Sequence, residues 1–234
     1  EECIMENAEF IPLALAGVSF VAAHLLPSSL ALRPRLVRIL GENGYLAAYT
    51  LFAFATFGWL CHAYVQAPHT VMLWNPGVLR FLPLLLMPVA LWFIVCGVSG
   101  PNPSSVRQEQ KLAEAEVASG MLRITRHPVQ WGIALFALGH LLANADLAAL
   151  LFFGALLLLA TLGMYHIDQR KAATLGEPWQ RFVAVTSLLP LGAVLAGRNR
   201  FVISELGGWR LLFAGALYLI LLLAHPWVIG VSPF

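Results

Sequence analysis

The sequence predicts an all-α protein, a polytopic bundle of about six membrane-spanning helices with both termini on the non-cytoplasmic side. Three observations lead to this fold class. Hydrophobic residues make up 59% of the 234 residues, charged residues make up 11%, and the mean hydropathy is +0.78, a composition outside the usual range of soluble domains. Several apolar runs approach the roughly 20 residues that cross a hydrocarbon core. The basic residues also gather on one side of these runs.

Six apolar runs account for the predicted spans. In chain order they are Phe10–Leu26, Leu46–Val65, Leu79–Val98, Val129–Ala143, Leu147–Ile167 and Trp209–Val231. The fourth run is short for a full crossing, so it is expected to tilt little, to lie in a thinned bilayer, or to share its depth with the loop after His127. Another apolar run, Leu188–Gly197, contains Pro190 and is too short to cross, which fits a re-entrant or interfacial segment.

The domain organisation follows from these spans. We predict a single membrane domain over residues 1–234, with cytoplasmic loops at 99–127 and 168–208 that contain interfacial helices. Of the 14 Lys and Arg residues, all but Arg80 fall on one side of the six-span arrangement. By the positive-inside rule that side is cytoplasmic and both termini point outward. Topology therefore accounts for the basic loops, and we expect no nucleic-acid partner.

Two further segments are predicted to form helices outside the bilayer. Leu32–Leu40 looks like a short amphipathic helix lying on the membrane surface. Arg107–Ser119 is polar and rich in glutamate, which is typical of a solvated cytoplasmic helix. The cysteines show no paired spacing, so they are interpreted as packed thiols rather than a disulfide framework or a zinc site. They are Cys3, Cys61 and Cys96.

The stretch Arg123-Ile-Thr-Arg-His-Pro128 places two arginines and a histidine at the mouth of the fourth span. Ionisable groups at this depth are costly and usually face a bundle interior. Arg123 and Arg126 either anchor a helix end or clamp an anionic cofactor group, since arginine binds carboxylates bidentately. Glu177 and Arg181, spaced i to i+4, either belong to the same site or only brace a cytoplasmic helix. The candidate cofactor-binding residues are Arg123, Arg126, His127, Glu177 and Arg181.

Histidines suggest a second kind of site. Four of them, His24, His140, His166 and His225, lie inside or at the edge of a predicted span. A lone intramembrane histidine is most often satisfied by a backbone carbonyl or a hydroxyl group. Several in one small bundle favour a metal or haem, because imidazole is a good ligand for haem iron and bundles present such ligands from facing helices.

Depth restricts which histidines can share one iron. On the predicted topology His24, His127 and His166 lie toward the cytoplasmic face, whereas His140 lies toward the outer face. His140 is roughly 20 Å beyond His127 along its helix. Two axial ligands must bring their ring nitrogens within about 4 Å of each other, twice the imidazole–metal distance. The residues alone therefore favour a pair from within one group.

Four stretches of the chain match a known pattern. They are Val21–Ser29; Met121–Pro128 with Gly139–Asn144; Asp168–Lys171 with Gly176–Phe182 and Thr186–Pro190; and Ala224–Pro226. In this order they resemble the NnrU family, which also includes the plant and cyanobacterial zeta-carotene isomerases, and the resemblance covers nearly the whole chain from about His24. It implies a bacterial inner-membrane protein linked to denitrification, around nitrite and nitric oxide reduction. The isomerase branch binds haem b and isomerises a central cis double bond of a linear carotene.

The isomerase branch also implies a ligand pair. Its ligands are taken to be the histidine of the first-span motif and the one thirteen residues beyond Arg-His-Pro, which match His24 and His140 here. The depth argument would instead pair His24 with His127 or His166. The expected metal ligands are therefore His24 and His140, with His127 and His166 as rivals.

A more distant likeness competes with the first. Arg-His-Pro followed by Glu177 and Arg181 is also similar to isoprenylcysteine methyltransferases, in which this region holds S-adenosylmethionine at the cytoplasmic face. Those enzymes usually have a Glu-rich, Tyr-containing stretch where this chain has Asp168–Lys171 and Trp179, and this departure puts the methyltransferase activity in doubt.

The function predicted from the sequence is that of a haem-b-binding membrane protein of NnrU type, associated with denitrification. Isomerase-like chemistry on an apolar substrate, carotenoid-like or quinone-like, would be its activity if it is an enzyme. The alternatives are a membrane methyltransferase that uses S-adenosylmethionine and a non-enzymatic haem sensor or accessory subunit. The lipid bilayer is the expected surrounding partner, and no catalytic residue can be assigned because no nucleophile–base pair, phosphate loop or zinc site is visible.

Overall fold

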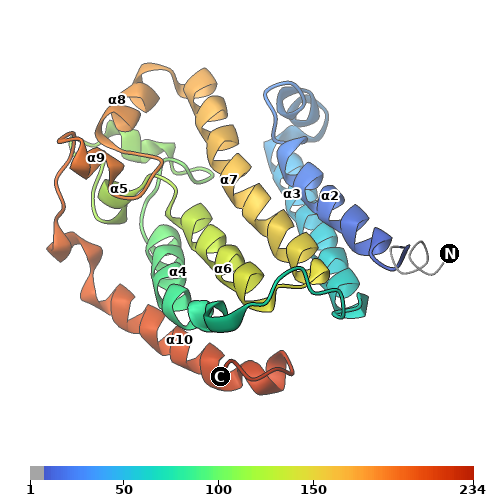
Figure 1. Ribbon diagram of the computed structural model, residues 1–234. Coiled ribbons are helices and arrows are strands. Elements are labelled where there is room, and N and C mark those ends of the chain that lie inside the picture. The colour runs from blue at the N-terminus through green and yellow to red at the C-terminus, as the bar shows by residue number, and fades with distance from the viewer. Residues whose placement is uncertain (1–7) are drawn as a thin grey trace. The chain divides into compact units, whose positions relative to one another are not determined.

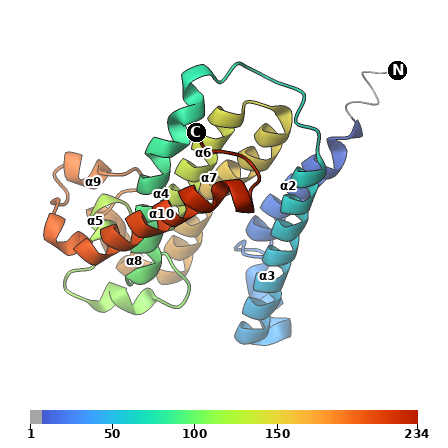
Figure 2. The ribbon, with the colours of Figure 1, turned by 90° about the horizontal axis from the view of Figure 1, so that it is seen from below.

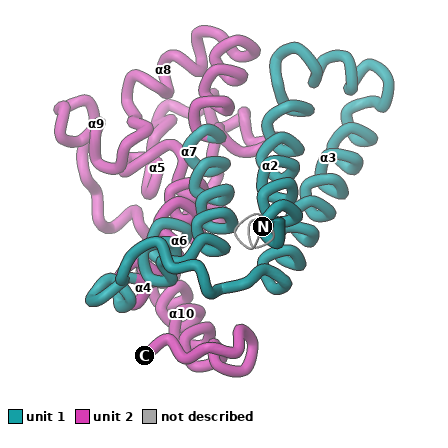
Figure 3. Tube along the Cα trace, turned by 45° about the vertical axis from the view of Figure 1, so that its right-hand side comes forward, with its two compact units in different colours: residues 1–82, 137–163 teal, residues 83–136, 164–234 magenta. Residues whose placement is uncertain are grey.

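The computed structural model describes residues 8–234, so Cys3 lies outside the described part. These residues form helices joined by loops, without a β-strand among them. Their isolated β-bridge joins Met72 and Asp146. The chain divides into two compact units (Figure 3). Unit 1 takes the chain up to Leu82 together with Ala137–Gly163, and unit 2 consists of Pro83–Phe136 and Met164–Phe234. The helical class is therefore confirmed.

Unit 1 is built around α2 (Ile11–Leu25) and α3 (Arg33–Gln66), which lie side by side in two views (Figures 1 and 2). The buried face of α2 repeats at intervals of three and four residues, as expected for one stripe of a helix. Its members are Leu13, Ala16, Gly17, Phe20 and Ala23. A Cβ on Gly17 would lie 3.4 Å from the Cβ of Ala155 in α7 (Leu147–Leu175), so small residues bring α2 and α7 into ordinary contact.

Helix α3 changes direction near its start. Gly41 has φ +71° and ψ 164° inside the helix, a conformation that glycine adopts without steric cost. The residues from Arg33 up to this break therefore form a separate short helix with Pro34 in its first turn. A short helix is thus confirmed over nearly the predicted stretch Leu32–Leu40, and its place on the membrane surface stays a prediction.

Unit 2 contains α4 (Leu82–Ser99), which follows the 3-10 turn η1 (Gly77–Phe81), and α10 (Gly208–Val228). It also holds the first half of α6 (Pro128–Asn144) and the last part of α7. α4 and α6 approach closely at glycine: a Cβ on Gly132 would lie 2.7 Å from the carbonyl oxygen of Ala90. A side chain at position 132 would therefore force the backbone of α4 to shift.

The connecting segments of unit 2 form only short helices. These are η2 (Glu109–Ala113), α5 (Met121–Ile124), α8 (Glu177–Val185), α9 (Gly192–Leu195) and η3 (Ile203–Leu206). The helix predicted over Arg107–Ser119 is wrong, because only the single turn η2 forms there. Leu112 and Ala118 are buried against Trp179 and Phe182 of α8, so tertiary packing overrides the local preference for a solvated helix.

All six predicted spans coincide with helices, but they differ in length. Four helical segments are long and apolar enough to cross a membrane; they are Arg33–Gln66, Gly77–Ser99, Leu147–Leu175 and Gly208–Val228. α2 has 15 residues and α6 has 17. The run Leu188–Gly197 contains only the four-residue α9, in agreement with the expectation that it does not cross.

Candidate functional site

The Arg-His-Pro motif lies in the interior of unit 2. All eight residues from Met121 to Pro128 are buried, and Thr125 and His127 have no exposed surface. α5 ends at Ile124, three extended or turn residues follow, and α6 starts at Pro128, where proline suits a first helical position. Buried non-helical backbone needs hydrogen-bond partners.

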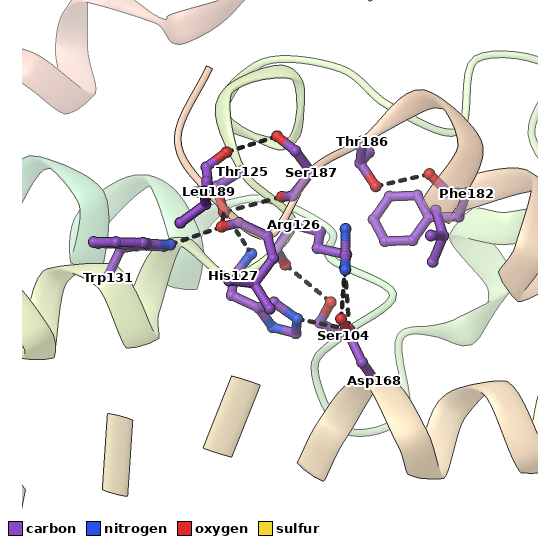
Figure 4. A network of polar contacts seen from close by, with 12 residues as sticks. Ser104, Thr125, Arg126, His127, Trp131, Asp168, Phe182, Thr186, Ser187 and Leu189 are labelled. Carbon is purple, nitrogen blue, oxygen red and sulfur yellow. Dashed lines mark hydrogen bonds and ion pairs between the residues drawn. The ribbon is translucent and has the colours of Figure 1, made fainter. Parts of the chain in front are cut away.

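The segment after α8 supplies these partners (Figure 4). The backbone N–H of Arg126 donates to the carbonyl oxygen of Ser187 (3.0 Å), and the Thr125 hydroxyl donates to that of Leu188 (2.8 Å). The Trp131 indole N–H also donates to the Leu188 carbonyl (2.8 Å). The apolar run that begins at Leu188 therefore braces the motif.

Asp168 is the centre of the charged network. It comes from α7, and its carboxylate accepts hydrogen bonds from Arg126 Nε (3.0 Å to each oxygen) and from Arg126 Nη2. The same carboxylate meets Nε2 of His127 at 2.7 Å. The Ser104 hydroxyl donates to the Arg126 carbonyl oxygen (2.9 Å), which secures the backbone as well. Asp168 thus compensates the buried Arg126 charge and orients the imidazole, as Figure 4 shows.

His127 is held as a neutral imidazole. Burial lowers its pKa below the ordinary value of 6.5, although Asp168 opposes this. Nε2–H then donates to Asp168, and Nδ1 has no hydrogen-bond partner within residues 8–234. An imidazole oriented by a carboxylate resembles a metal ligand, but the ring has no exposed surface, so a haem has no access to this nitrogen.

Arg123 is engaged by acidic residues in the same way. Its guanidinium donates to Glu205 through Nε (2.8 Å) and Nη2 (3.0 Å), to Glu116 (2.9 Å) and to the side-chain oxygen of Asn199 (2.7 Å). Glu205 also accepts the N–H of Gly120 (2.7 Å). The Arg123 hydrogen bonds, with that of Gly120, lower the pKa of Glu205 to about 2, so this carboxylate is ionised at neutral pH.

The two remaining residues of the predicted cofactor-binding set lie at the surface. Glu177 and Arg181 are both exposed on α8, and no ion pair joins them in the described part of the chain. α8 is instead held by its buried face, where Trp179 is 1% and Phe182 0% exposed. The structure therefore buries Arg123, Arg126 and His127, with Arg126 and His127 sharing Asp168 and Arg123 in a separate network around Glu205, and it leaves Glu177 and Arg181 at the surface.

His24 lies in unit 1, on α2. Its Nδ1 is 2.8 Å from the carbonyl oxygen of Phe20, one turn earlier in α2. Because a carbonyl only accepts, Nδ1 carries the proton and Nε2 keeps its lone pair. The ring is half-buried and makes edge contacts with Phe20 and Tyr49. This tautomer is the one that an axial ligand to iron requires.

His140 belongs to the same unit. Its ring stacks on Phe153 of α7 with centroids 5.2 Å apart, and it is half-buried. Gly17 faces Leu151 and Ala155, so Gly17 and His140 lie at the same level of α7. α2 and this part of α7 run in the same direction (Figure 1), and His24 is seven residues beyond Gly17, roughly 10 Å farther along the axis. This offset of the His24 Cα is about half of the separation predicted from the topology, and the two rings lie closer in depth still, because the His24 ring reaches back one turn to Phe20.

His166 lies in unit 2, two residues before Asp168 on α7. Two residues turn an α-helix by about 200°, so His166 leaves the helix on the face opposite to the one that contacts His127. Within residues 8–234 there is no cluster of three or more His, Cys, Asp or Glu side chains that would hold a metal ion. Haem ligation by two histidines does not need such a cluster.

Glu205 and Asn199 complete the site and were not predicted, whereas Asp168, at the end of the fifth apolar run, was expected to pair with this cluster, and that pairing is confirmed. Only Asp168 had a local signal, because a carboxylate at the end of an apolar helix is expected to pair with a nearby cation. Glu205 is 82 residues from Arg123 in the sequence, and no spacing pattern joins the two. Their pairing is visible only in the folded chain.

A family model described as "NnrU protein" matches residues 12–233, nearly the whole chain. No curated protein and no solved structure matches this chain.

Proposed function

Because the chain belongs to the NnrU family, we propose that it is a haem-binding integral membrane protein in which six helices cross the bilayer. The distribution of Lys and Arg supports both termini on the non-cytoplasmic side. α2 and α6, with 15 and 17 residues, are roughly 22–26 Å long, close to the hydrocarbon thickness of about 30 Å. The non-helical backbone before α6 is buried in protein, a condition under which such backbone is tolerated at membrane depth.

We assign His24 and His140 as the axial ligands of haem b. The observation that carries this assignment is the hydrogen bond from His24 Nδ1 to the Phe20 carbonyl, which leaves Nε2 as a lone-pair donor. Both histidines are half-buried in unit 1 and lie against aromatic rings. The resemblance to the isomerases, in which the matching positions are ligands, supports the same pair. His127 is the weaker rival because its ring is enclosed and its Nε2 is bonded to Asp168.

We further propose that the protein lies in the bacterial inner membrane and has a role in denitrification. Haem, when bound, supplies a redox-gated Lewis acid or an electron relay. His24 and His140 would hold the iron, and apolar helix surfaces would receive a carotenoid-like or quinone-like substrate. Cis–trans isomerisation of a linear polyene is the enzymatic form of this proposal; a haem sensor or accessory subunit is the non-enzymatic form.

The first experiment is an absorption spectrum of the purified protein, oxidised and reduced with dithionite, together with a pyridine haemochrome assay. The wild type is expected to contain about one haem b per chain with sharp reduced α and β bands. His24→Ala and His140→Ala are each expected to lose most of the haem, whereas His127→Asn and the matched control His225→Ala keep it. Loss of haem in His127→Asn with retention in His140→Ala would overturn the ligand pair, and a haem-free wild type would overturn the proposal.

A turnover assay separates the enzymatic from the non-enzymatic form. Haem-loaded protein would be incubated with a linear carotene that has a central cis double bond, and the isomers would be separated by chromatography. Conversion that disappears in His24→Ala supports the isomerase. Haem binding without conversion supports the sensor or accessory subunit.

A methyltransferase is the second candidate, and one observation favours it. The two segments that resemble methyltransferases pack together in unit 2, since Leu122 of α5 contacts Trp179 and Phe182 of α8. The arginines that would clamp the methionine carboxylate, Arg123 and Arg126, are however already paired with carboxylates of the chain. Equilibrium dialysis with S-adenosylmethionine tests this candidate, and binding by a haem-free protein would make it the first choice.

A further inference from the structure

A cavity of about 260 Å³ lies in unit 2, beside the buried motif. Three segments meet around it: the end of α4, the residues just before and within α5, and the start of α10 with the turn before it. Backbone of Gly97, Gly100 and Gly120 forms part of the wall, and Met121 and Leu206 supply apolar surface. The walls are therefore part polar and part apolar, as in sites for amphiphilic molecules.

Two charged side chains line this cavity, and they differ in their partners. Glu205 is bonded to Arg123. Arg210 has no carboxylate partner within the described residues: Nε donates to the Ser99 hydroxyl (2.8 Å) and Nη2 to the Ser99 carbonyl oxygen (3.4 Å). Its guanidinium also lies over the ring of Trp209, 5.1 Å from the centroid. Neutral groups thus hold Arg210 in position without cancelling its charge.

Two buried arginines of unit 2 differ from Arg210 in their partners. Arg123 and Arg126 are compensated by Glu205 and Asp168. Arg210 is half-buried, is held only by Ser99 and the Trp209 ring, and has no carboxylate partner within the described residues at the wall of a cavity. Guanidinium groups bind phosphate and carboxylate oxygens in bidentate fashion, so the chemistry of this wall selects an oxyanion.

The position of the cavity, at the ends of two long apolar helices, favours a lipid headgroup as the source of the oxyanion. Ser99 is the last residue of α4 and Arg210 is in the first turn of α10, and both helices are long and apolar enough to cross a membrane. The ends of such helices lie at the level of the lipid headgroups, where basic pockets between helices bind phospholipids. A second hollow of about 460 Å³ shares Gly100 and Pro101 with the first and gives room for a larger headgroup.

We propose that the cavity beside Arg210 binds the phosphate group of a membrane phospholipid. Arg210 pairs with the phosphate, and the apolar wall at Met121 and Leu206 receives the start of the glycerol and acyl part. The site is independent of the haem ligands, because none of its lining residues belongs to unit 1.

The test is a fluorescence titration of the protein in a neutral maltoside detergent, because the indole of Trp209 contacts Arg210. The probes are dioctanoyl phosphatidylglycerol, inorganic phosphate and dioctanoylglycerol, which has no phosphate. The variants are Arg210→Gln, Arg210→Lys and Ser119→Phe, which keeps the charge but fills the cavity. Arg200→Gln is the matched control, since Arg200 is an exposed arginine of the same region that does not line the cavity.

We expect phosphatidylglycerol to bind the wild type, and dioctanoylglycerol to bind at least tenfold more weakly. Arg210→Gln and Ser119→Phe should each weaken binding about tenfold, the loss of one charge-assisted contact, with Arg210→Lys in between and Arg200→Gln within twofold of wild type. Saturation by inorganic phosphate with the same dependence on Arg210 would support the oxyanion site and assign a soluble source. Equal weakening in Arg210→Gln and Arg200→Gln, or no binding by the wild type, would overturn the proposal. Haem content of the same variants should stay unchanged.

Discussion

The two histidines that stand out most in the sequence occupy opposite environments. His127 in unit 2 is enclosed, neutral and tied to Asp168, within a network that also neutralises Arg126. His24 in unit 1 is half-buried, its Nδ1 is bonded to the Phe20 carbonyl of its own helix, and its ring lies against the rings of Phe20 and Tyr49. The difference shows that a charged motif before an apolar helix can form a buried, paired network, while a histidine within another apolar helix stays partly exposed.

The same contrast extends to the packing of the helices. In unit 2, α4 and α6 meet so closely at Gly132 that a Cβ would be 2.5 Å from Cγ1 of Ile94. In unit 1, the contact of α2 with α7 at Gly17 leaves ordinary van der Waals distances. Unit 2 thus combines a paired charge network with a tight helix contact at Gly132, whereas the helix contact at Gly17 in unit 1 has ordinary spacing.

Removal of the Asp168 carboxylate is expected to have the largest effect on stability, because it disrupts the charge network of unit 2. We expect Asp168→Asn to lower the free energy of unfolding by about 3–5 kcal/mol, because Arg126 would remain as an uncompensated buried charge. Thermal unfolding in detergent measures the effect. Glu177→Gln, at an exposed glutamate of α8, is the control and should stay within about 0.5 kcal/mol of wild type. Similar stability of the two variants would mean that the network contributes little.

Two glycine substitutions test the difference between the tight α4–α6 contact and the ordinary α2–α7 contact. Gly132→Ala should destabilise the protein by about 1–3 kcal/mol, since the added methyl group meets the backbone of Ala90 and α4 must shift. Gly17→Ala should be neutral or slightly stabilising, because alanine favours the helix by up to about 1 kcal/mol and its Cβ meets nothing nearer than 3.4 Å. Melting temperatures compare the two, and an equal loss would contradict the difference in packing.

The smallest expected effect is a pH dependence. Glu205 has a pKa of about 2 in the folded chain against an ordinary value of 4.5. Below about pH 4.5 the unfolded chain takes up a proton that the folded chain does not, so the contribution of the Arg123–Glu205 pair falls between pH 4.5 and 2. Melting temperatures at pH 5, 4 and 3 should fall more steeply for wild type than for Glu205→Gln. Parallel curves would show that this carboxylate titrates normally.

Much of this molecule was predictable because apolar length and periodicity are local properties of the chain. The positions of the six apolar helices, the short helix before Gly41 and the failure of Leu188–Gly197 to cross all follow from runs of neighbouring residues. The Arg-His-Pro motif and His24 also stand out in the sequence, because polar groups are rare in so apolar a chain. The sequence alone could not rule out the helix that was wrongly predicted over Arg107–Ser119. The segment is mostly polar, and only the folded chain shows that its Leu112 and Ala118 are buried.

The sequence by itself determined the helical membrane class, the family pattern and which cations and histidines needed an explanation. Tertiary structure alone decided what those groups do. Glu205, Asn199 and Asp168 approach the motif from 42 to 82 residues away, and no local spacing encodes a pairing at such separation. Burial then acts on the charge state, because enclosure lowers the pKa of His127 below its ordinary value. The same folding leaves Arg210 without a carboxylate partner among residues 8–234, which its neighbours in the sequence do not indicate.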